Sequence, residues 1–585
     1  MEALEAPPHN PLWCAPFPRG TQKLGDVGPL LHSPPMTSTA YRTAPVPSTA
    51  MPKGIPYIVG NEAAERFSFY GMKTILMVFM TQYLLTVTGT PAYMTETEAR
   101  EWVAWFVASA YFFPVIGAIV ADALLGKYRT ILLLSWLYCA GHLALAMMDL
   151  PPKGLEATME PKSWLMAGLF LIALGSGGIK PCVSAPVGDQ FGETNKHLLT
   201  RVFGWFYFSI NFGSFFSTLL TPWLLARYGP GWAFGVPGIL MGIATVVFWM
   251  GRHKFVHIPP RGMGFVREAF SGEGLATIGK LVPIYAFVAV FWALYDQTGG
   301  AWIIQAQQMD RRFLGLNLME SQIQAINPLL ILVFIPLASY VAFPLIGRAF
   351  TLTPIRKIGI GFFLTVAAFS ISATAEERID AAKSQFRATV DAAIARSEVD
   401  VGRTIAALRE ERLNAAAADL AAASGMREGL PAEQRTPPDA AAMARALAEG
   451  GIVVSQSGTV QRAAWPSISW QLLAYVVITA AEVLVSITCL EFSYTQAPPQ
   501  MKSFIMSLYL LSVSAGNVII ALVNRFTKDA DGNSTLVGAE YYWFFTKMMA
   551  VAAVLFIVVG LLYRPRDYMQ AEDPAVPHPP SRPPE

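Results

Sequence analysis

Three charged side chains lie close together in an otherwise apolar stretch near the beginning of the chain, at Glu62, Glu65 and Arg66. Their spacing of i, i+3 and i+4 places them on one face of a helix. If that helix crosses a membrane, each charge costs about 2.5–3.5 kcal/mol on insertion scales, so such residues are usually paired and functional. A position in the headgroups at the helix mouth is the weaker interpretation. The spacing therefore predicts a polar site that faces a wet cavity.

Further ionisable residues are Lys73, later in the same segment, and Lys180, Asp296 and Glu482 in other apolar segments. At about 1.5 Å of rise per helical residue, Lys180 reaches the same depth of the membrane as Glu65, and we expect the two to pair. The cations belong to the first half of the chain, and the second half offers Asp296 and Glu482. A cavity with one positive and one negative wall suits a zwitterion whose amine and carboxylate lie some distance apart.

Uncharged polar residues in the apolar helices provide additional candidates for contacts to a substrate. For each residue alone, a hydrogen bond between helices explains its presence about as well. Their number favours a binding role for the group, which consists of Tyr70, Tyr111, Tyr207, Asn211 and Asn327.

The composition is that of an integral membrane protein. Of the 585 residues, 53% are hydrophobic and only 14% are charged, against about 25% in a typical soluble domain. The mean hydropathy is +0.41. No basic tract indicates nucleic-acid binding, and the four cysteines show no spacing typical of a metal site or of disulfides.

Twelve apolar segments are long enough to cross a bilayer, which requires about 20 residues. Lys and Arg are concentrated in the loops after even-numbered segments, as at Lys127, Arg129 and Arg252, and this places both termini in the cytoplasm. The fold class predicted is all-α, with twelve transmembrane helices in two six-helix bundles. The expected spans are about 55–86, 102–122, 128–149, 163–186, 202–225, 232–250, 281–306, 322–346, 354–373, 467–492, 501–524 and 540–563.

An insert at residues 374–466 interrupts the apolar pattern. Its Ala-rich part, Glu376–Ala423, has a narrow apolar stripe at helical spacing and predicts one helix that would reach about 70 Å if unbroken. A shorter helix is expected at 439–448. Because the insert joins spans 9 and 10, we expect it outside the cell, where a tolerated surface insertion is favoured over a docking arm.

These segments divide the chain into seven parts. Met51 is a candidate for the true start of translation, because residues 1–53 read as a disordered cytoplasmic tail. The other parts are a first bundle at 54–250, a cytoplasmic linker at 251–280, helices 7–9 at 281–373, the extracytoplasmic insert at 374–466, helices 10–12 at 467–565 and a disordered cytoplasmic tail at 566–585.

The chain closely resembles the proton-coupled oligopeptide transporters, a branch of the major facilitator superfamily. The likeness covers about 54–372 and 467–565. The segments that carry it are 62–71 (EAAERFSFYG), 117–129 (GAIVADALLGKYR), 175–191 (GSGGIKPCVSAPVGDQF), 206–214 (FYFSINFGS), 291–297 (FWALYDQ) and 482–498 (EVLVSITCLEFSYTQAP).

The resemblance implies a symporter in the plasma membrane or bacterial inner membrane that imports di- and tripeptides with protons. It implies proton coupling through Glu62, Glu65, Arg66, Lys180 and Asp296, with no cofactor beyond the proton. Expected partners are small peptides and the lipid bilayer, with no nucleic acid, and the chain is expected to be a monomer. The implied substrate-binding residues are Arg66, Tyr70, Lys73, Tyr111, Lys180, Tyr207, Asn211, Trp292, Asn327, Glu482, Ser486 and Tyr509.

Three departures from the family pattern alter these expectations. Phe69 stands where a second tyrosine is common, and Lys73 stands where arginine is common, so bidentate binding of a carboxylate is lost there. The region of span 2 where animal members carry a histidine reads VAWF at 103–106, so coupling should rest on carboxylates. The alternatives kept open are symport of nitrate, an amino acid or another small solute, and an intramembrane enzyme or receptor.

Overall fold

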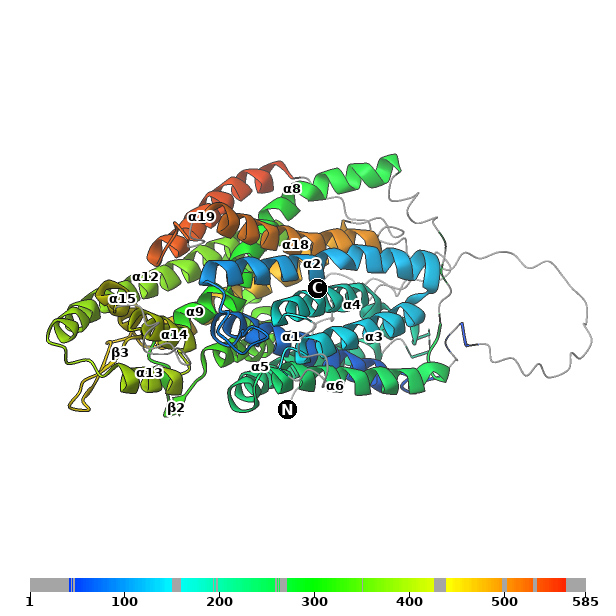
Figure 1. The fold of residues 1–585 in the computed structure, drawn as a ribbon. Helices are drawn as coiled ribbons and strands as arrows, with labels where there is room; N and C mark the ends of the chain where they lie inside the picture. The colour runs from blue at the N-terminus through cyan, green and yellow to red at the C-terminus, as the bar shows by residue number, and fades with distance from the viewer. Residues whose placement is uncertain are drawn as a thin grey trace, which may run out of the picture.

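Helices dominate the protein, for which we describe a computed structural model (Figure 1). About a third of the predicted linker, most of the predicted N-terminal tail and all of the predicted C-terminal tail lie outside the residues that the structure describes. These are 41–43, 45, 48–149, 159–192, 194–195, 198–257, 260, 262, 271–349, 351–425, 438–496, 502–529 and 534–563.

The first bundle contains six long helices that share one apolar core. The sequence sets several of their ends. Thr95 caps α2 by accepting a hydrogen bond from the Glu98 amide at 3.2 Å. Prolines begin α4 and α6, where no amide hydrogen is needed. The helices are α1 (Ile55–Gln82), α2 (Glu96–Ile119), α3 (Lys127–Ala146), α4 (Pro161–Asp189), α5 (Leu199–Tyr228) and α6 (Pro230–Met250), with a π-helical turn η1 (Val120–Leu125) and a 3₁₀ turn η3 (Gly251–His253).

The second bundle has its own apolar core and more broken helices. Its seventh predicted span consists of α8 (Gly272–Tyr295), η4 (Asp296–Gly299) and α9 (Ala301–Gln307). A small hairpin of β1 (Arg312–Phe313) and β2 (Leu316–Asn317) follows. The remaining elements are η5 (Glu320–Ala325), α10 (Ile326–Leu337), η6 (Ala338–Ala342), α11 (Phe343–Ala349), α12 (Pro354–Ala395), α16 (Ser469–Glu482), η8 (Val483–Ile487), α17 (Thr488–Thr495), α18 (Lys502–Phe526) and α19 (Ala539–Leu562).

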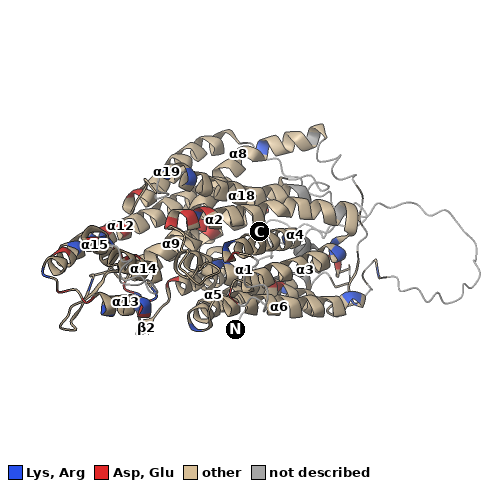
Figure 2. Cartoon of the chain, viewed as in Figure 1, with Lys and Arg blue, Asp and Glu red and all other residues tan. Residues whose placement is uncertain are grey.

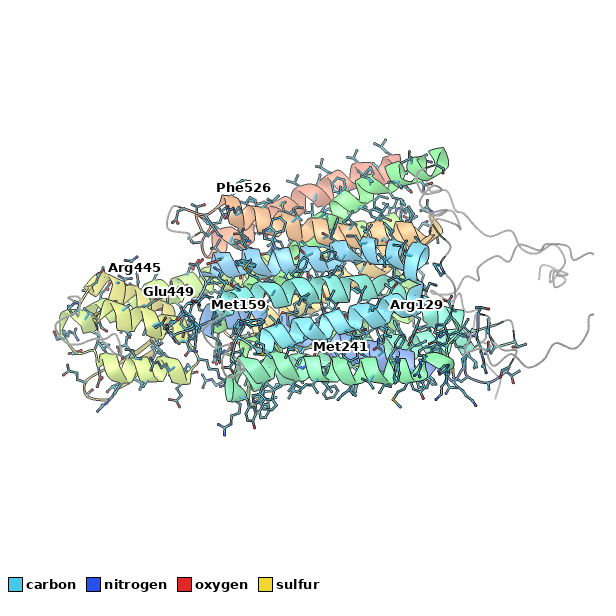
Figure 3. The ribbon with its side chains drawn as sticks, turned by 45° about the vertical axis from the view of Figure 1, so that its right-hand side comes forward. Arg129, Met159, Met241, Arg445, Glu449 and Phe526 are labelled. Carbon is cyan, nitrogen blue, oxygen red and sulfur yellow. The ribbon has the colours of Figure 1, made fainter. Side chains whose placement is uncertain are left out.

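The insert folds at one end of the bundles, which we call the insert end (Figure 1). Figure 3 shows Arg445 and Glu449 at that end and Arg129 toward the other, and Figure 2 shows Lys, Arg, Asp and Glu gathered in the insert while the bundle helices are mostly uncharged. The insert has a third apolar core. Its elements after α12 are α13 (Val401–Glu410), α14 (Asn414–Ala423), α15 (Ala440–Gly450) and a hairpin of β3 (Ile452–Val454) and β4 (Val460–Arg462).

The prediction of one unbroken helix over Glu376–Ala423 was wrong. The α12 helix runs through the expected span boundary at 373 and ends at Ala395, and turns then separate α12, α13 and α14. Ser397 and Arg412 take positive φ values of 55° and 65° in these turns. Asp400 begins α13 by accepting from the Arg403 amide at 3.0 Å. The breaks let the short helices fold onto each other and bury their apolar stripes.

Helices lie at the positions of all the expected spans. Among the described residues, ten are long and apolar enough to cross a membrane. The α1 and α5 helices fall outside that set; α1 carries Glu62, Glu65, Arg66 and Lys73. The protein is a multi-pass membrane protein, and the count of twelve crossings remains a prediction.

The end of the expected N-terminal tail is ordered in part, which differs from the prediction for residues 1–53. Tyr41 stacks on His257 with ring centroids 4.1 Å apart, and the His257 amide donates to the Arg42 carbonyl at 2.7 Å. The Ser48 amide donates to Thr194 at 3.1 Å. Burial lowers the pKa of His257, so the stacked ring is neutral near pH 7.

Replacing Gly117 with alanine is expected to destabilise the first bundle. A Cβ on Gly117 would lie 2.5 Å from the Gly178 Cα, where α2 crosses α4. Overpacking of this kind costs about 1–3 kcal/mol of unfolding free energy. The midpoint of thermal unfolding in detergent should fall. Gly242→Ala is the matched control in α6, since its Cβ meets nothing within 4 Å, and an unchanged midpoint for Gly117→Ala would contradict the tight crossing.

Candidate functional site

The charged cluster of α1 forms the ion pairs that its spacing predicts. Arg66 Nε lies 2.7 Å from Glu62 Oε1 and 3.3 Å from Glu65 Oε2. Both carboxylates are almost fully buried, with 1% of their surface exposed. One arginine therefore balances two carboxylates, which leaves the cluster with a net negative charge when both are ionised.

A hydrogen bond to Glu65 comes from α4. Ser176 Oγ donates to Glu65 Oε1 at 2.7 Å and is itself fully buried. Ser176 lies one residue after Gly175, whose missing side chain lets α4 approach α3 near Tyr138. Ser176 thus joins α4 directly to Glu65 of α1.

Lys180 does not pair with Glu65, and this expectation was wrong. The Lys180 ammonium lies 3.9 Å from the ring centre of Phe69 and 4.0 Å from that of Tyr111. No described residue accepts a hydrogen bond from it. Glu65 accepts from Ser176 and lies beside Arg66, while the two rings hold Lys180 by cation–π contacts. A cation held in this way is available to an incoming anion.

On the second bundle, Glu482 lies at the end of α16 and is oriented by amide and hydroxyl groups. Asn327 of α10 donates to Glu482 Oε2 at 2.8 Å and to Thr479 at 3.1 Å. The π-helical turn η8 begins immediately after Glu482, and such turns are frequent at functional sites. Ser486 of this turn lies 3.2 Å from the Tyr509 hydroxyl of α18.

An ion pair that the sequence did not predict joins the two bundles. Lys73 Nζ of α1 lies 2.8 Å from Asp296 Oδ1, with 13% and 6% of the side chains exposed. Asn517 of α18 donates to Asp296 Oδ2 at 2.6 Å. Gly516 permits this approach, because its Cβ would lie 2.5 Å from the Ala289 carbonyl oxygen of α8. Lys73 was expected to bind a substrate carboxylate, whereas in this structure it pairs with Asp296.

The remaining candidates lie between these two walls. Tyr70 packs against the first-bundle core beside Phe69, with ring centroids 5.7 Å apart. Tyr207 of α5 is an electrostatic neighbour of Glu482.

Tyr111 packs against both bundle cores. Asn211 donates to the Tyr207 carbonyl of its own helix at 3.0 Å, and Trp292 packs against Phe291 and Tyr295. The structure thus brings the predicted residues to one interface, with Asn211 turned toward its own backbone.

Three functional neighbours were missed by the sequence reasoning, namely Ser176, Thr479 and Asn517. Asn517 follows Ser514 by three residues in an apolar helix, which is a usable signal for a polar face. Ser176 and Thr479 carried no comparable signal, since isolated hydroxyl residues commonly bond to their own helix backbone. The described residues contain no group of three His, Cys, Asp or Glu that could hold a metal.

Comparisons with known proteins show that the chain is similar to peptide transporters. The model of a family described as "POT family" matches residues 128–272, 271–408 and 440–544. "Peptide transporter family 1" of Drosophila melanogaster is 29% identical over 90% of this chain and 89% of its own. "Solute carrier family 15 member 2" of Mus musculus is 29% identical over 93% of this chain and 94% of its own.

Solved structures agree in fold over nearly the whole chain. The crystal structure of the POT family transporter PepTSo is 30% identical, with a TM-score of 0.66, and covers 88% of this chain and 98% of its own. A crystal structure of a proton dependent oligopeptide (POT) family transporter is 31% identical, with a TM-score of 0.60, and covers 86% of this chain and 100% of its own.

Proposed function

This chain belongs to the POT family, and from this premise we propose that it imports di- and tripeptides together with protons by alternating access of its two bundles. Family membership sets it among transporters rather than enzymes. The observation that carries the proposal is the polarity of the interface, with Arg66 and Lys180 on the first bundle and Glu482 on the second. A nitrate ion has no amine and would leave Glu482 without a partner.

We place the insert end outside the cell and both termini in the cytoplasm of a plasma membrane or bacterial inner membrane. The concentration of Lys and Arg in the loops of the opposite end supports this orientation. The lipid bilayer and small peptides are the proposed partners, the proton is the proposed coupling ion, and the transporter works as a monomer.

A bound peptide would span the two walls. Its carboxylate binds Lys180 and Arg66, and its amine binds Glu482, Asn327 and Asn211. Lys73 joins the carboxylate side only when Asp296 releases it. The surrounding contacts come from Tyr70, Tyr111, Tyr207, Trp292, Ser486 and Tyr509.

We derive the proton coupling from the contacts of Glu65. A proton on Glu65 removes one of the two carboxylate charges beside Arg66, so Arg66 keeps only Glu62 as an anionic partner, and Arg66 and Lys180 attract the substrate carboxylate more strongly. The same proton stays compatible with the Ser176 contact, because a carboxyl group retains an acceptor oxygen. Rocking of the bundles then opens the opposite side. A membrane potential of 100 mV adds about 2.3 kcal/mol for each net charge moved.

The direct test is uptake of labelled dialanine into proteoliposomes under an imposed pH gradient. We expect accumulation that collapses with a protonophore and is inhibited by di- and tripeptides but not by tetrapeptides or nitrate. Accumulation of nitrate or a free amino acid, with no competition by dipeptides, would overturn the proposal.

Lys180→Ala is expected to abolish dialanine uptake while the fold stays intact. The substitution removes a cation held between two rings, and the loss of one charge-assisted contact to the carboxylate costs about 1.5–3 kcal/mol of binding. The measurement is the uptake rate at fixed peptide concentration, with thermal unfolding as the check on folding. Lys162→Ala is the matched control, because this lysine lies on the same helix with 49% of its side chain exposed. Uptake that survives in Lys180→Ala would remove Lys180 from the binding site.

A further inference from the structure

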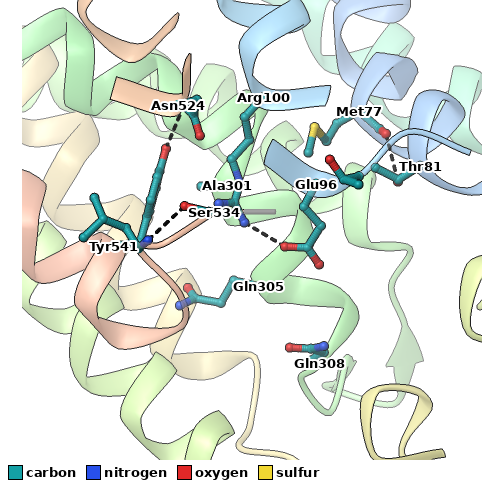
Figure 4. Close-up of polar contacts among 12 residues, drawn as sticks. Met77, Thr81, Glu96, Arg100, Ala301, Gln305, Gln308, Asn524, Ser534 and Tyr541 are labelled. Atoms are coloured by element: carbon teal, nitrogen blue, oxygen red, sulfur yellow. Dashed lines mark hydrogen bonds and ion pairs between the residues drawn. The ribbon is translucent and has the colours of Figure 1, made fainter. Parts of the chain in front are cut away.

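The two bundles are joined to each other at the insert end. Arg100 of α2 bonds Glu96 at 2.8 Å and lies 4.6 Å from the ring centre of Tyr541 in α19 (Figure 4). Nearer the middle of both helices, Ser514 of α18 donates to the Ala108 carbonyl of α2 at 2.7 Å. Together with the Lys73–Asp296 pair, these contacts close this end between the bundles.

The insert is fastened to the second bundle. The α12 helix begins in the second bundle and ends in the insert. The insert and the second bundle therefore cannot move separately without bending α12. Glu449 of α15 bonds Lys383 at 2.8 Å and Gln308 at 3.0 Å. The Asp310 amide donates to the Pro466 carbonyl at 2.9 Å. The insert therefore moves with the second bundle.

The insert also contacts the first bundle, at the last residue of α1. Asn414 Nδ2 donates to the Gln82 carbonyl at 3.0 Å, and the Ala415 amide donates to Gln82 Oε1 at 2.8 Å. Gln82 is buried, with 7% of its surface exposed. The first amides of a helix have no partner within the helix, so Gln82 satisfies one of these amides in α14. We call Gln82, Asn414 and Ala415 the latch residues.

We infer that the insert is a latch that stabilises the state closed at the insert end and so regulates the transport cycle; this rests on the proposed alternating access. The latch residues belong to different bundles, so their two hydrogen bonds must break whenever α1 moves away from the second bundle. Two hydrogen bonds are strong enough to shift a conformational equilibrium and weak enough to break in each cycle.

Distances between spin labels test the latch without any substrate. Labels at Val87→Cys and Val537→Cys report on the two bundles, since these side chains are 42% and 63% exposed at the insert end. The background replaces the four native cysteines. We expect Gln82→Ala and Asn414→Ala each to raise the ratio of long to short distances by about three- to tenfold, as the loss of one hydrogen bond predicts.

The matched control is Gln456→Ala, which removes an amide that donates to the Ser397 carbonyl at 3.0 Å within the insert. It should leave the distances unchanged. Unchanged distances in both latch variants, or an equal shift in Gln456→Ala, would overturn the latch.

A cross-link provides the reciprocal experiment. Gln82→Cys with Asn414→Cys joins α1 to the insert when oxidised, and uptake should stop and return on reduction. Full uptake by cross-linked protein would overturn the latch. A protein that takes up no peptide in any form, but whose label distances shift as expected, would refute the proposed substrate and support the latch.

Discussion

Replacing Glu65 with glutamine is expected to abolish the accumulation of dialanine that a pH gradient drives. A gradient of one pH unit can drive about tenfold accumulation for each coupled proton, because one unit corresponds to about 1.4 kcal/mol. The amide cannot be protonated, and it no longer attracts Arg66 or Lys180. The cycle then runs as if position 65 were permanently protonated, so peptide moves down its own gradient only. The measured ratio of internal to external dialanine should therefore settle at one.

Counterflow distinguishes lost coupling from lost transport. Vesicles loaded with unlabelled dialanine should still exchange it for labelled dialanine through the Glu65→Gln variant, since binding and rocking do not require the proton. The control is Glu540→Gln, an exposed carboxylate at the beginning of α19. Full accumulation by Glu65→Gln would show that the coupling proton binds elsewhere, and loss of counterflow would make Glu65 a structural residue.

Local spacing predicted the contacts that lie within one helix or at equal depth. The Glu62–Arg66 pair follows from an i, i+4 spacing and is present at 2.7 Å. Such predictions succeed because helix geometry fixes the face and hydropathy fixes the depth.

Contacts across helices could not be predicted, because depth does not determine the direction in which a side chain points. Lys180 and Glu65 were expected at equal depth, yet Ser176 bonds to the carboxylate and two aromatic rings hold the lysine. Lys73 and Asp296 are 223 residues apart and meet only through the packing of the bundles.

The insert shows the same limit. Its apolar stripe predicted helices, while the turns at Ser397 and Arg412 depend on a core shared by α12–α15.

Breaking the Lys73–Asp296 pair is expected to open the insert end. Removing one partner of a buried ion pair costs about 3–5 kcal/mol, because the other charge stays buried without a partner. Lys73→Asp or Asp296→Lys should therefore reduce the ratio of closed to open states by a factor of about 10²–10³, measured with the labels at positions 87 and 537. The double variant Lys73→Asp with Asp296→Lys restores opposite charges at the same 2.8 Å contact. Because Asn517 can offer its amide oxygen to the new lysine, the closed state should return to within about tenfold of the original ratio.

The matched control is the exposed pair Lys162–Glu98, which has the same 2.8 Å separation in the first bundle. Surface pairs contribute about 0–1 kcal/mol, so Lys162→Asp, Glu98→Lys and their combination should leave the label distances nearly unchanged. If reversal of the surface charges opened the insert end as far as Lys73→Asp does, the effect would come from net charge rather than from the buried pair. If the double variant of the buried pair stayed open, charge complementarity would not explain the closure. In that case the single variants would open the insert end by disturbing the packing around Lys73, Asp296 and Asn517 rather than by removing a charge pair.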